Sequence, residues 1–150
     1  MEFRSAKKSD LKEIVRLLAD DELGSKREKY EDPLPEAYYN AFSEIQNQYG
    51  NQILLAIEGK NIIGCLQLTI IPGLSRLGMK RAQIEGVRVD KNYRGKKIGE
   101  ALLQEAITIS TSEGCGLVQL TTDKSRVDAH RFYEKMGFIP SHEGLKLTLD

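Results

Sequence analysis

The sequence of 150 residues lacks several features that would identify a class of protein at once. It contains two cysteines, two histidines and four prolines, and no repeat or low-complexity tract. No apolar run approaches the roughly 20 residues that span a bilayer. Positive and negative side chains balance at 22 each, so no overall field attracts nucleic acid or an anionic membrane. Partners must therefore be selected by local sites.

The cysteines and histidines are too scattered to indicate a disulfide framework or a metal site. Cys65 and Cys115 lie about fifty residues apart among apolar neighbours, and His130 and His142 share no metal-ligand spacing with them. We expect buried, reduced thiols and no metal. Because no cationic and then apolar leader follows Met1, the sequence predicts a cytoplasmic protein.

The hydrophobic periodicity that is present predicts one globular domain spanning residues 1–150. The expected elements are a strand at 1–6, helices from 10 and at 35–48, a hairpin of 52–58 with 62–71, a strand at 81–90, a helix from 97, a strand at 117–122, a helix at 128–136 and a β-rich tail after 137. Residues 20–36 are acidic and interrupted by proline, and we expect a mobile loop there. This order describes a mixed α/β (α+β) domain around one central sheet.

A basic, glycine-rich turn stands where the strand at 81–90 leads into the helix from 97. Its sequence, NYRGKKIGEALL from Asn92, places Arg94, Gly95, Lys96, Lys97 and Gly99 close together. Backbone N–H groups at such a turn point outward at the positive end of the helix dipole, which makes an anion site. The alternative is a solvated helix entrance with a glycine turn. The sequence contains neither the GxxxxGK[ST] nor the GxGxxG nucleotide motif.

Two segments together carry a family resemblance. VRVDKNYRGKKIGEALLQEAI and, further on, DAHRFYEKMGF resemble the acetyl-coenzyme A binding core of the GCN5-related N-acetyltransferases (GNAT family). The order of elements along nearly all of the chain is similar to that fold as well. The resemblance implies a central, mostly antiparallel twisted sheet of about six to seven strands flanked by about four helices.

The resemblance also implies which residues bind acetyl-CoA. The family motif [QR]xxGx[GA] aligns with Arg94, Lys97 and Gly99, and Lys97 in the central glycine position implies φ values that a side chain allows. Arg126 stands where many relatives carry asparagine, so it is available to reach a phosphate or an anionic acceptor. The cofactor-binding set expected from the resemblance is Val87, Arg88, Val89, Arg94, Gly95, Lys96, Lys97, Ile98, Gly99 and Arg126.

Two further residues receive catalytic roles from the resemblance. Tyr133 matches the family tyrosine that protonates the leaving thiolate, and Glu85 lies where relatives often carry a base that acts directly or through water. A main-chain N–H at Val87 to Val89 is expected to polarise the thioester carbonyl. The alternatives are a tyrosine that packs beside Phe132 and a glutamate that is solvated on its strand.

These residues predict an acetyl-CoA-dependent N-acetyltransferase that acts on a primary amine of a small molecule by direct attack in a ternary complex. The end of the chain looks most like aminoalkylphosphonate N-acetyltransferases. We expect the acidic residues of 20–36 to attract the cationic amine, with Tyr38 and Tyr39 lining the same cleft or belonging to the core. The sequence leaves open whether the chain forms a homodimer. The rival functions are a noncatalytic acyl-CoA sensor, a nucleotide-binding module and a protein or peptide N-acetyltransferase.

Overall fold

A five-stranded sheet runs through the centre of the computed structural model, which describes residues 1–150. In spatial and sequence order its strands are β1 (Glu2–Ser5), β2 (Asn51–Glu58), β3 (Asn61–Ile71), β4 (Arg81–Val89) and β5 (Leu117–Leu120). All neighbours are antiparallel except β4 and β5, which are parallel. The parallel pair requires a crossover, and the helix between the two strands supplies it.

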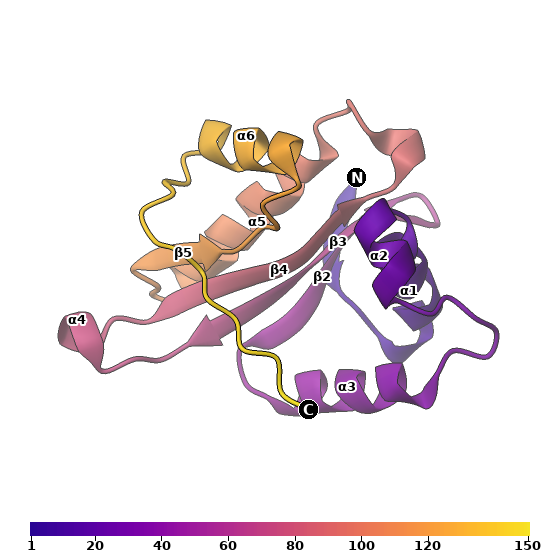
Figure 1. Cartoon of the computed structure of the whole chain (residues 1–150), viewed down its shortest axis with the longest axis horizontal. Helices are drawn as coiled ribbons and strands as arrows, with labels where there is room; N and C mark the ends of the chain where they lie inside the picture. Colours follow the sequence, from indigo (N-terminus) through magenta and orange to yellow (C-terminus); the bar gives the residue numbers. More distant parts are fainter.

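Helices cover both faces of the sheet. They are α1 (Leu11–Ala19), α2 (Glu22–Arg27), α3 (Glu36–Asn47), α4 (Ser75–Gly78), α5 (Ile98–Ser112) and α6 (Val127–Lys135), with 3₁₀ turns at Lys8–Asp10 and Lys91–Tyr93. In Figure 1, α5 and α6 lie on one face, and α1, α2 and α3 lie on the other. No helix combines the length and the apolar character that crossing a membrane requires.

Successive residues of the central strands belong to two apolar clusters, one on each face of the sheet. Leu54 and Leu66 face α5, where they pack with Leu102, whereas their neighbours Leu55 and Cys65 pack against α1. These side chains are all almost completely buried. The burial of both faces of the central strands explains why β2 and β3 are nearly continuous apolar runs in the sequence.

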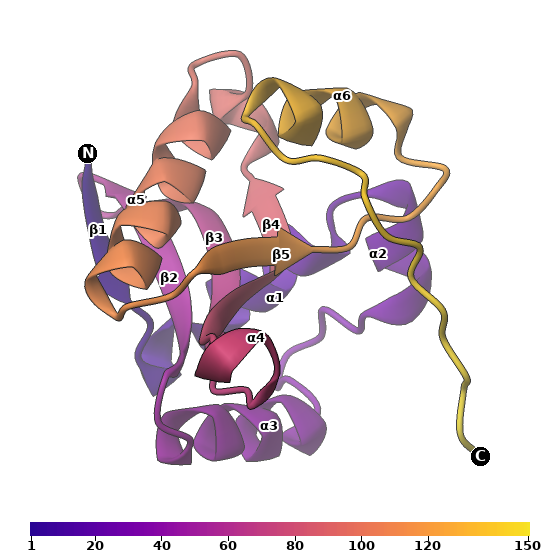
Figure 2. The ribbon, with the colours of Figure 1, turned by 90° about the vertical axis from the view of Figure 1, so that its left-hand side faces the viewer.

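Most predicted elements are confirmed, including the mixed α/β class and the hairpin of β2 and β3, but the predicted numbers are wrong. The sheet has five strands rather than six to seven, and there are six α-helices rather than about four. The missing strand is the tail, which forms neither helix nor strand although Leu145, Leu147 and Leu149 alternate with polar residues. An alternation of apolar and polar residues gives a segment one apolar face, but a strand forms only when its backbone pairs with a neighbouring strand. Figure 2 shows the tail running past β5 and away from the sheet.

The prediction of a loop throughout 20–36 is also wrong, because α2 forms within it. Asp21 caps this short helix by accepting a hydrogen bond from the Gly24 N–H at 2.5 Å. The backbone at Gly24 passes close to the end of α1, because a Cβ at Gly24 would lie only 2.0 Å from the Leu18 carbonyl oxygen. The Asp10 side chain, by contrast, does not cap α1. Its carboxylate instead accepts a hydrogen bond from the Lys7 N–H at 2.7 Å and binds the Arg4 guanidinium.

Candidate functional site

The turn between β4 and α5 is held to the body by Asp90. Its backbone N–H donates to the Ile63 carbonyl at 2.8 Å, and its carboxylate accepts from the Asn92 N–H at 2.8 Å. The same carboxylate pairs with Arg16 of α1 at 3.1 Å. Asp90 is buried, so these bonds fix the start of the turn on both β3 and α1. Asp90 therefore holds the first residues of the turn in a fixed position relative to β3 and α1.

The backbone of the turn enters the left-handed region twice. Gly95 has a φ of 79°, and Lys97, the residue before α5, has φ 60° and ψ 25°. Lys97 therefore lies in the small left-handed region, which a side chain can adopt but only with strain. The position keeps the conformation that favours glycine, and a lysine there costs about 1–2 kcal/mol relative to a right-handed residue. The turn tolerates this strain because Asp90 and α5 hold both of its ends.

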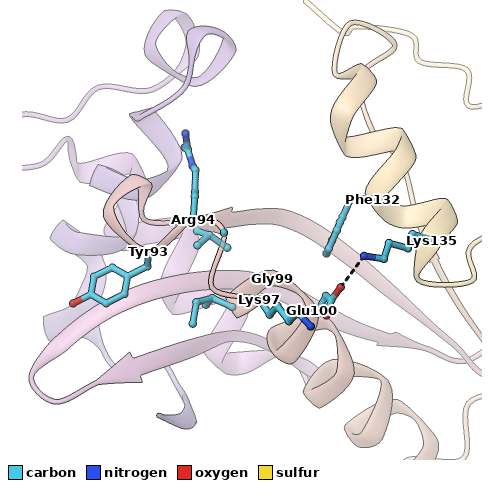
Figure 3. Close-up of a pocket in the computed structure, with 10 residues that line it drawn as sticks. Tyr93, Arg94, Lys97, Gly99, Glu100, Phe132 and Lys135 are labelled. Carbon is cyan, nitrogen blue, oxygen red and sulfur yellow. Dashed lines mark ion pairs between the residues drawn. The ribbon is translucent and has the colours of Figure 1, made fainter.

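The start of α5 leaves backbone donors free. No side chain caps the helix, and the first bond in its ladder runs from the Ala101 N–H to the Lys97 carbonyl at 3.1 Å. The N–H groups of residues 98–100 therefore have no acceptor within the helix. These residues belong to the lining of a cavity of about 300 Å³, shown in Figure 3, which is formed by Val89, Tyr93, Arg94, Gly95, Lys97, Ile98, Gly99, Glu100, Phe132 and Lys135.

Six of the ten predicted cofactor residues line this cavity, namely Val89, Arg94, Gly95, Lys97, Ile98 and Gly99. The other four, Val87, Arg88, Lys96 and Arg126, do not. Lys96 lies over the ring of Tyr93, with its Nζ 5.2 Å from the ring centroid. At Gly99, a Cβ would lie 3.4 Å from Phe132 Cζ and 3.7 Å from Val89 Cγ2, so a larger side chain would fill the cavity.

The sequence analysis missed the wall that α6 contributes. Phe132 and Lys135 both line the cavity, and Lys135 pairs with Glu100 across it at 3.6 Å (Figure 3). Their spacing of three residues puts them on one face of a helix, which is the signal that could have linked them. Lys135 thus adds a partly neutralised cation to the α6 wall of the cavity that Arg94 and Lys97 also line.

The sheet opens beside this cavity. β4 pairs with β5 only from Arg81 to Ile84, so residues 85–89 have no partner strand on that side. A β-bulge centred on Gly86, which has a φ of 61°, sits at the start of this unpaired edge. The free N–H and C=O groups beyond it suit a ligand with amide groups of its own.

The bulge also decides which way the predicted site residues point. Ala82 and Ile84 face α5, and after the extra residue Val87 and Val89 face α5 as well. Arg88 therefore lies on the opposite face, across from Cys65 on β3. Glu85, across from Gln67, shares that opposite face, is exposed, and forms no hydrogen bond or ion pair with the chain.

Tyr133 lies on α6 between two phenylalanines. Its ring meets those of Phe132 and Phe138 edge-on, with centroids 5.3 and 5.9 Å away. Burial raises the pKa of the Tyr133 hydroxyl, and the charges of Arg88 and Arg126 oppose this only in part. The hydroxyl is consequently protonated at neutral pH, as a proton donor must be. Tyr133 therefore packs between the two phenylalanines, and its hydroxyl also feels the charges of Arg88 and Arg126.

Arg126 and Arg88 meet over a single carboxylate. Arg126 donates to Asp21 Oδ2, and Arg88 Nε lies 3.7 Å from the same oxygen. Burial alone would raise the pKa of Asp21, but the Gly24 N–H and the two arginines hold it below its ordinary value. The negative charge that residues 20–36 bring here is therefore already paired. This does not fit the expectation that the segment attracts a cationic amine.

The remaining candidates fall outside the site. The Tyr38 hydroxyl donates to Glu28 at 2.7 Å, and both Tyr38 and Tyr39 pack against the α1 cluster, so the core alternative holds for them. Cys65 is buried as expected, and burial raises the pKa of its thiol to about 12. Cys115 is only half-buried. Neither thiol is activated as a nucleophile.

Comparison with known protein families identifies the whole arrangement. The profile of the family described as "Acetyltransferase (GNAT) family" matches residues 12–138. The match begins in α1, includes the turn before α5, and ends just after α6. It therefore covers the cavity, the unpaired edge of β4 and Tyr133.

Individual relatives carry different descriptions. A glucosamine 6-phosphate N-acetyltransferase of Trypanosoma brucei brucei is 38% identical over 88 residues, which are 59% of this chain and 58% of that protein. An aminoalkylphosphonate N-acetyltransferase of Salmonella typhimurium is 33% identical over 88 residues, 59% of this chain and 56% of that protein. The chain thus spans less than two thirds of either enzyme's length.

One solved structure is similar over almost its full length. A protein of Bacillus halodurans, described as a transcriptional regulator, is 49% identical, with a TM-score of 0.96 over 99% of both chains. Its description differs in kind from those of the two enzymes, although the fold is shared.

Proposed function

This chain belongs to the acetyltransferase (GNAT) family, an N-acetyltransferase family that uses acetyl-CoA, and from that premise we propose that it transfers the acetyl group to a primary amine of a small molecule. The observation that carries the proposal is the turn before α5. Its free N–H groups, two residues with left-handed φ and flanking cations stand beside an unpaired strand edge. A phosphate at the turn and an amide-bearing arm along the edge suit this combination.

The residues that would hold acetyl-CoA line two adjoining surfaces. The N–H groups of residues 98–100, with Arg94 and Lys97, suit the pyrophosphate, because charged donors and aligned N–H groups both favour an anion. The edge of Val87 to Val89 suits the pantetheine amides, and an N–H there can polarise the thioester carbonyl. When bound, acetyl-CoA supplies a carbonyl carbon that an amine can attack.

Two proton transfers fall to side chains of the chain. A primary ammonium has a pKa near ~10.4, so it must lose a proton before its nitrogen can form the new C–N bond. Glu85, exposed on the face that also carries Arg88, accepts that proton directly or through water. As the C–S bond breaks, the Tyr133 hydroxyl donates its proton to sulfur and is reprotonated from solvent. Direct attack in a ternary complex needs no covalent acetyl-enzyme, and the high pKa of Cys65 supports this.

The names of the relatives support a particular kind of acceptor. Glucosamine 6-phosphate and aminoalkylphosphonates are both small amines that also carry a phosphate or phosphonate group. We therefore propose a small-molecule amine rather than a protein terminus as the acceptor. The whole of residues 1–150 acts as one acetyltransferase domain in this proposal.

The test is release of free thiol from acetyl-CoA in the presence of a library of primary amines. We expect amine-dependent release, and we expect Tyr133→Phe to lower kcat by about 10²-fold with little change in the Kd for acetyl-CoA, since the hydroxyl is needed only as the sulfur departs. If Tyr133→Phe turns over at the wild-type rate, the tyrosine has only its packing role between Phe132 and Phe138.

A second candidate function is a noncatalytic acyl-CoA sensor. The similarity to a protein described as a transcriptional regulator is the observation in its favour. A sensor would bind acetyl-CoA at the same turn but would need neither Glu85 nor Tyr133. Tight binding of acetyl-CoA by calorimetry, without thiol release for any amine, would favour the sensor over the enzyme.

A further inference from the structure

The arginines at Asp21 have more positive charge than the carboxylate can balance. Arg88 comes from β4, Arg126 from the residue before α6, and Asp21 from the residue before α2. The three side chains are only 17%, 25% and 23% exposed, so solvent screens them weakly. Arg27, at the end of α2, adds a further positive charge that acts on Arg88.

Arg88 is also incompletely hydrogen-bonded. Its Nη1 donates to the carbonyl of Val87 at 2.9 Å, whereas its Nε is buried and has no partner at hydrogen-bond distance. An unmade bond from a buried, charged donor is unfavourable, so the group is ready to bind an acceptor that reaches it. A guanidinium presents its N–H groups as a planar fork that fits the oxygens of a carboxylate, phosphate or phosphonate.

This cluster is separate from the cavity before α5 and adjacent to the proposed reaction centre. Val89 lines the cavity, and Arg88 points to the other face of the sheet because of the bulge at Gly86. The charges of Arg88 and Arg126 both act on the Tyr133 hydroxyl. A group bound by the arginines would thus lie near the proton donor but not in the pyrophosphate site.

We propose that Arg88 and Arg126 bind a phosphate or phosphonate group on the acceptor amine and thereby orient its nitrogen. Resting on the proposed function, this assigns the class of acceptor and the residues that select it. A doubly charged group with three oxygens can serve both forks while Asp21 stays in place to hold the arginines apart. A carboxylate, with two oxygens and one charge, satisfies fewer of these donors.

Matched acceptors test this directly. Aminoethylphosphonate, β-alanine and ethanolamine share a short aminoalkyl chain and differ in the terminal group, which is a phosphonate, a carboxylate or a neutral hydroxyl. We expect the wild-type kcat/KM to be highest for the phosphonate. Arg126→Gln and Arg88→Gln should each lower it for the phosphonate about tenfold to a hundredfold, mainly through KM, and should lower it much less for ethanolamine.

The control is Arg131→Gln, because Arg131 is an exposed arginine of α6 that pairs only with Asp128. It should leave all three acceptors unaffected. Arg126→Lys keeps the charge without the fork and should recover only part of the loss. Thermal unfolding of each variant separates a lost contact from a lost fold.

The outcomes distinguish this proposal from the proposed function. Equal rates for phosphonate and ethanolamine, or equal losses for both in the variants, would overturn the arginine site and leave the acetyltransferase intact. Binding of aminoethylphosphonate by calorimetry, lost in Arg126→Gln, with no thiol release would support the arginine site and refute the enzyme.

Discussion

Replacing Lys97 by glycine should stabilise the protein, although the lysine stands in the proposed cofactor site. Lys97 has φ 60° and ψ 25°, the left-handed conformation in which a Cβ crowds the following carbonyl. Removing the Cβ relieves about 1–2 kcal/mol, while the greater freedom of glycine in the unfolded chain costs about 0.4–1 kcal/mol. The net gain of about 0.5–1 kcal/mol corresponds to a rise in Tm of roughly 1–4 °C for a chain of this length.

Two further variants isolate the cause. Lys97→Ala removes the charge but keeps the Cβ, so its Tm should stay close to that of the wild type. Gly95→Ala makes the opposite change at φ 79°, where an added Cβ has no atom within 4 Å. Its cost is therefore backbone strain without a steric clash, offset in part by the smaller freedom of alanine in the unfolded chain, and we expect its Tm to fall by roughly 1–4 °C.

The assay is thermal unfolding followed by circular dichroism, with calorimetry of coenzyme A binding. Lys97→Gly and Lys97→Ala lose the same charge, so they should bind coenzyme A equally and more weakly than the wild type. If Lys97→Gly is no more stable than Lys97→Ala, then Lys97 is not strained and the turn does not depend on a left-handed residue.

Three other expectations follow from the same structure. Gly99→Val should weaken coenzyme A binding at least about tenfold, because the side chain would meet Phe132 and fill the cavity; unchanged affinity by calorimetry would remove the turn from the site. Glu85→Gln should depress kcat most at low pH and recover as free amine becomes available, so a constant ratio to the wild type from about pH 6 to about pH 9 would deny Glu85 the role of base. Asp10→Asn should cost about 1.5–3 kcal/mol at neutral pH, since the carboxylate accepts from Arg4 at 2.8 and 3.1 Å. The Arg4 hydrogen bond lowers the Asp10 pKa, so this contribution is present above the unfolded value of about 3.9 and disappears as pH falls through the lower folded value; a difference in Tm that persists at the lowest pH would contradict it.

What the sequence predicted well depends on neighbours along the chain. The hairpin of β2 and β3 follows from two β-rich runs around a short turn, and the anion site follows from glycines and cations before an amphipathic helix. Such features are encoded within a few residues, so a single sequence reveals them. The family resemblance then supplied roles for Tyr133 and Glu85 that no local pattern contains.

What the sequence could not predict depends on residues far apart. The sequence predicts Asp21 to be one of the acidic residues of a mobile loop, whereas it caps α2 and binds arginines from β4 and from the start of α6. The sequence also predicts a β-rich tail after 137, but the tail forms no strand, because an alternating pattern does not by itself provide a pairing partner. Periodicity predicts which face of a segment is apolar and leaves open what that face will meet.

The bulge at Gly86 explains how one strand can serve two ligands. Strict alternation from Ala82 and Ile84 would bring Arg88 into the apolar layer beneath α5, where a guanidinium without partners is strongly disfavoured. The extra residue reverses the order, so that Val87 and Val89 complete the α5 layer and Arg88 reaches Asp21 on the other face. Because β4 also leaves β5 at this point, its backbone edge is open between the two faces. In our proposal, the donor lies along that edge from the α5 side and the acceptor approaches from the arginine side. The reacting atoms meet where the strand is irregular, because a regular strand would offer neither the open edge nor the reversed arginine.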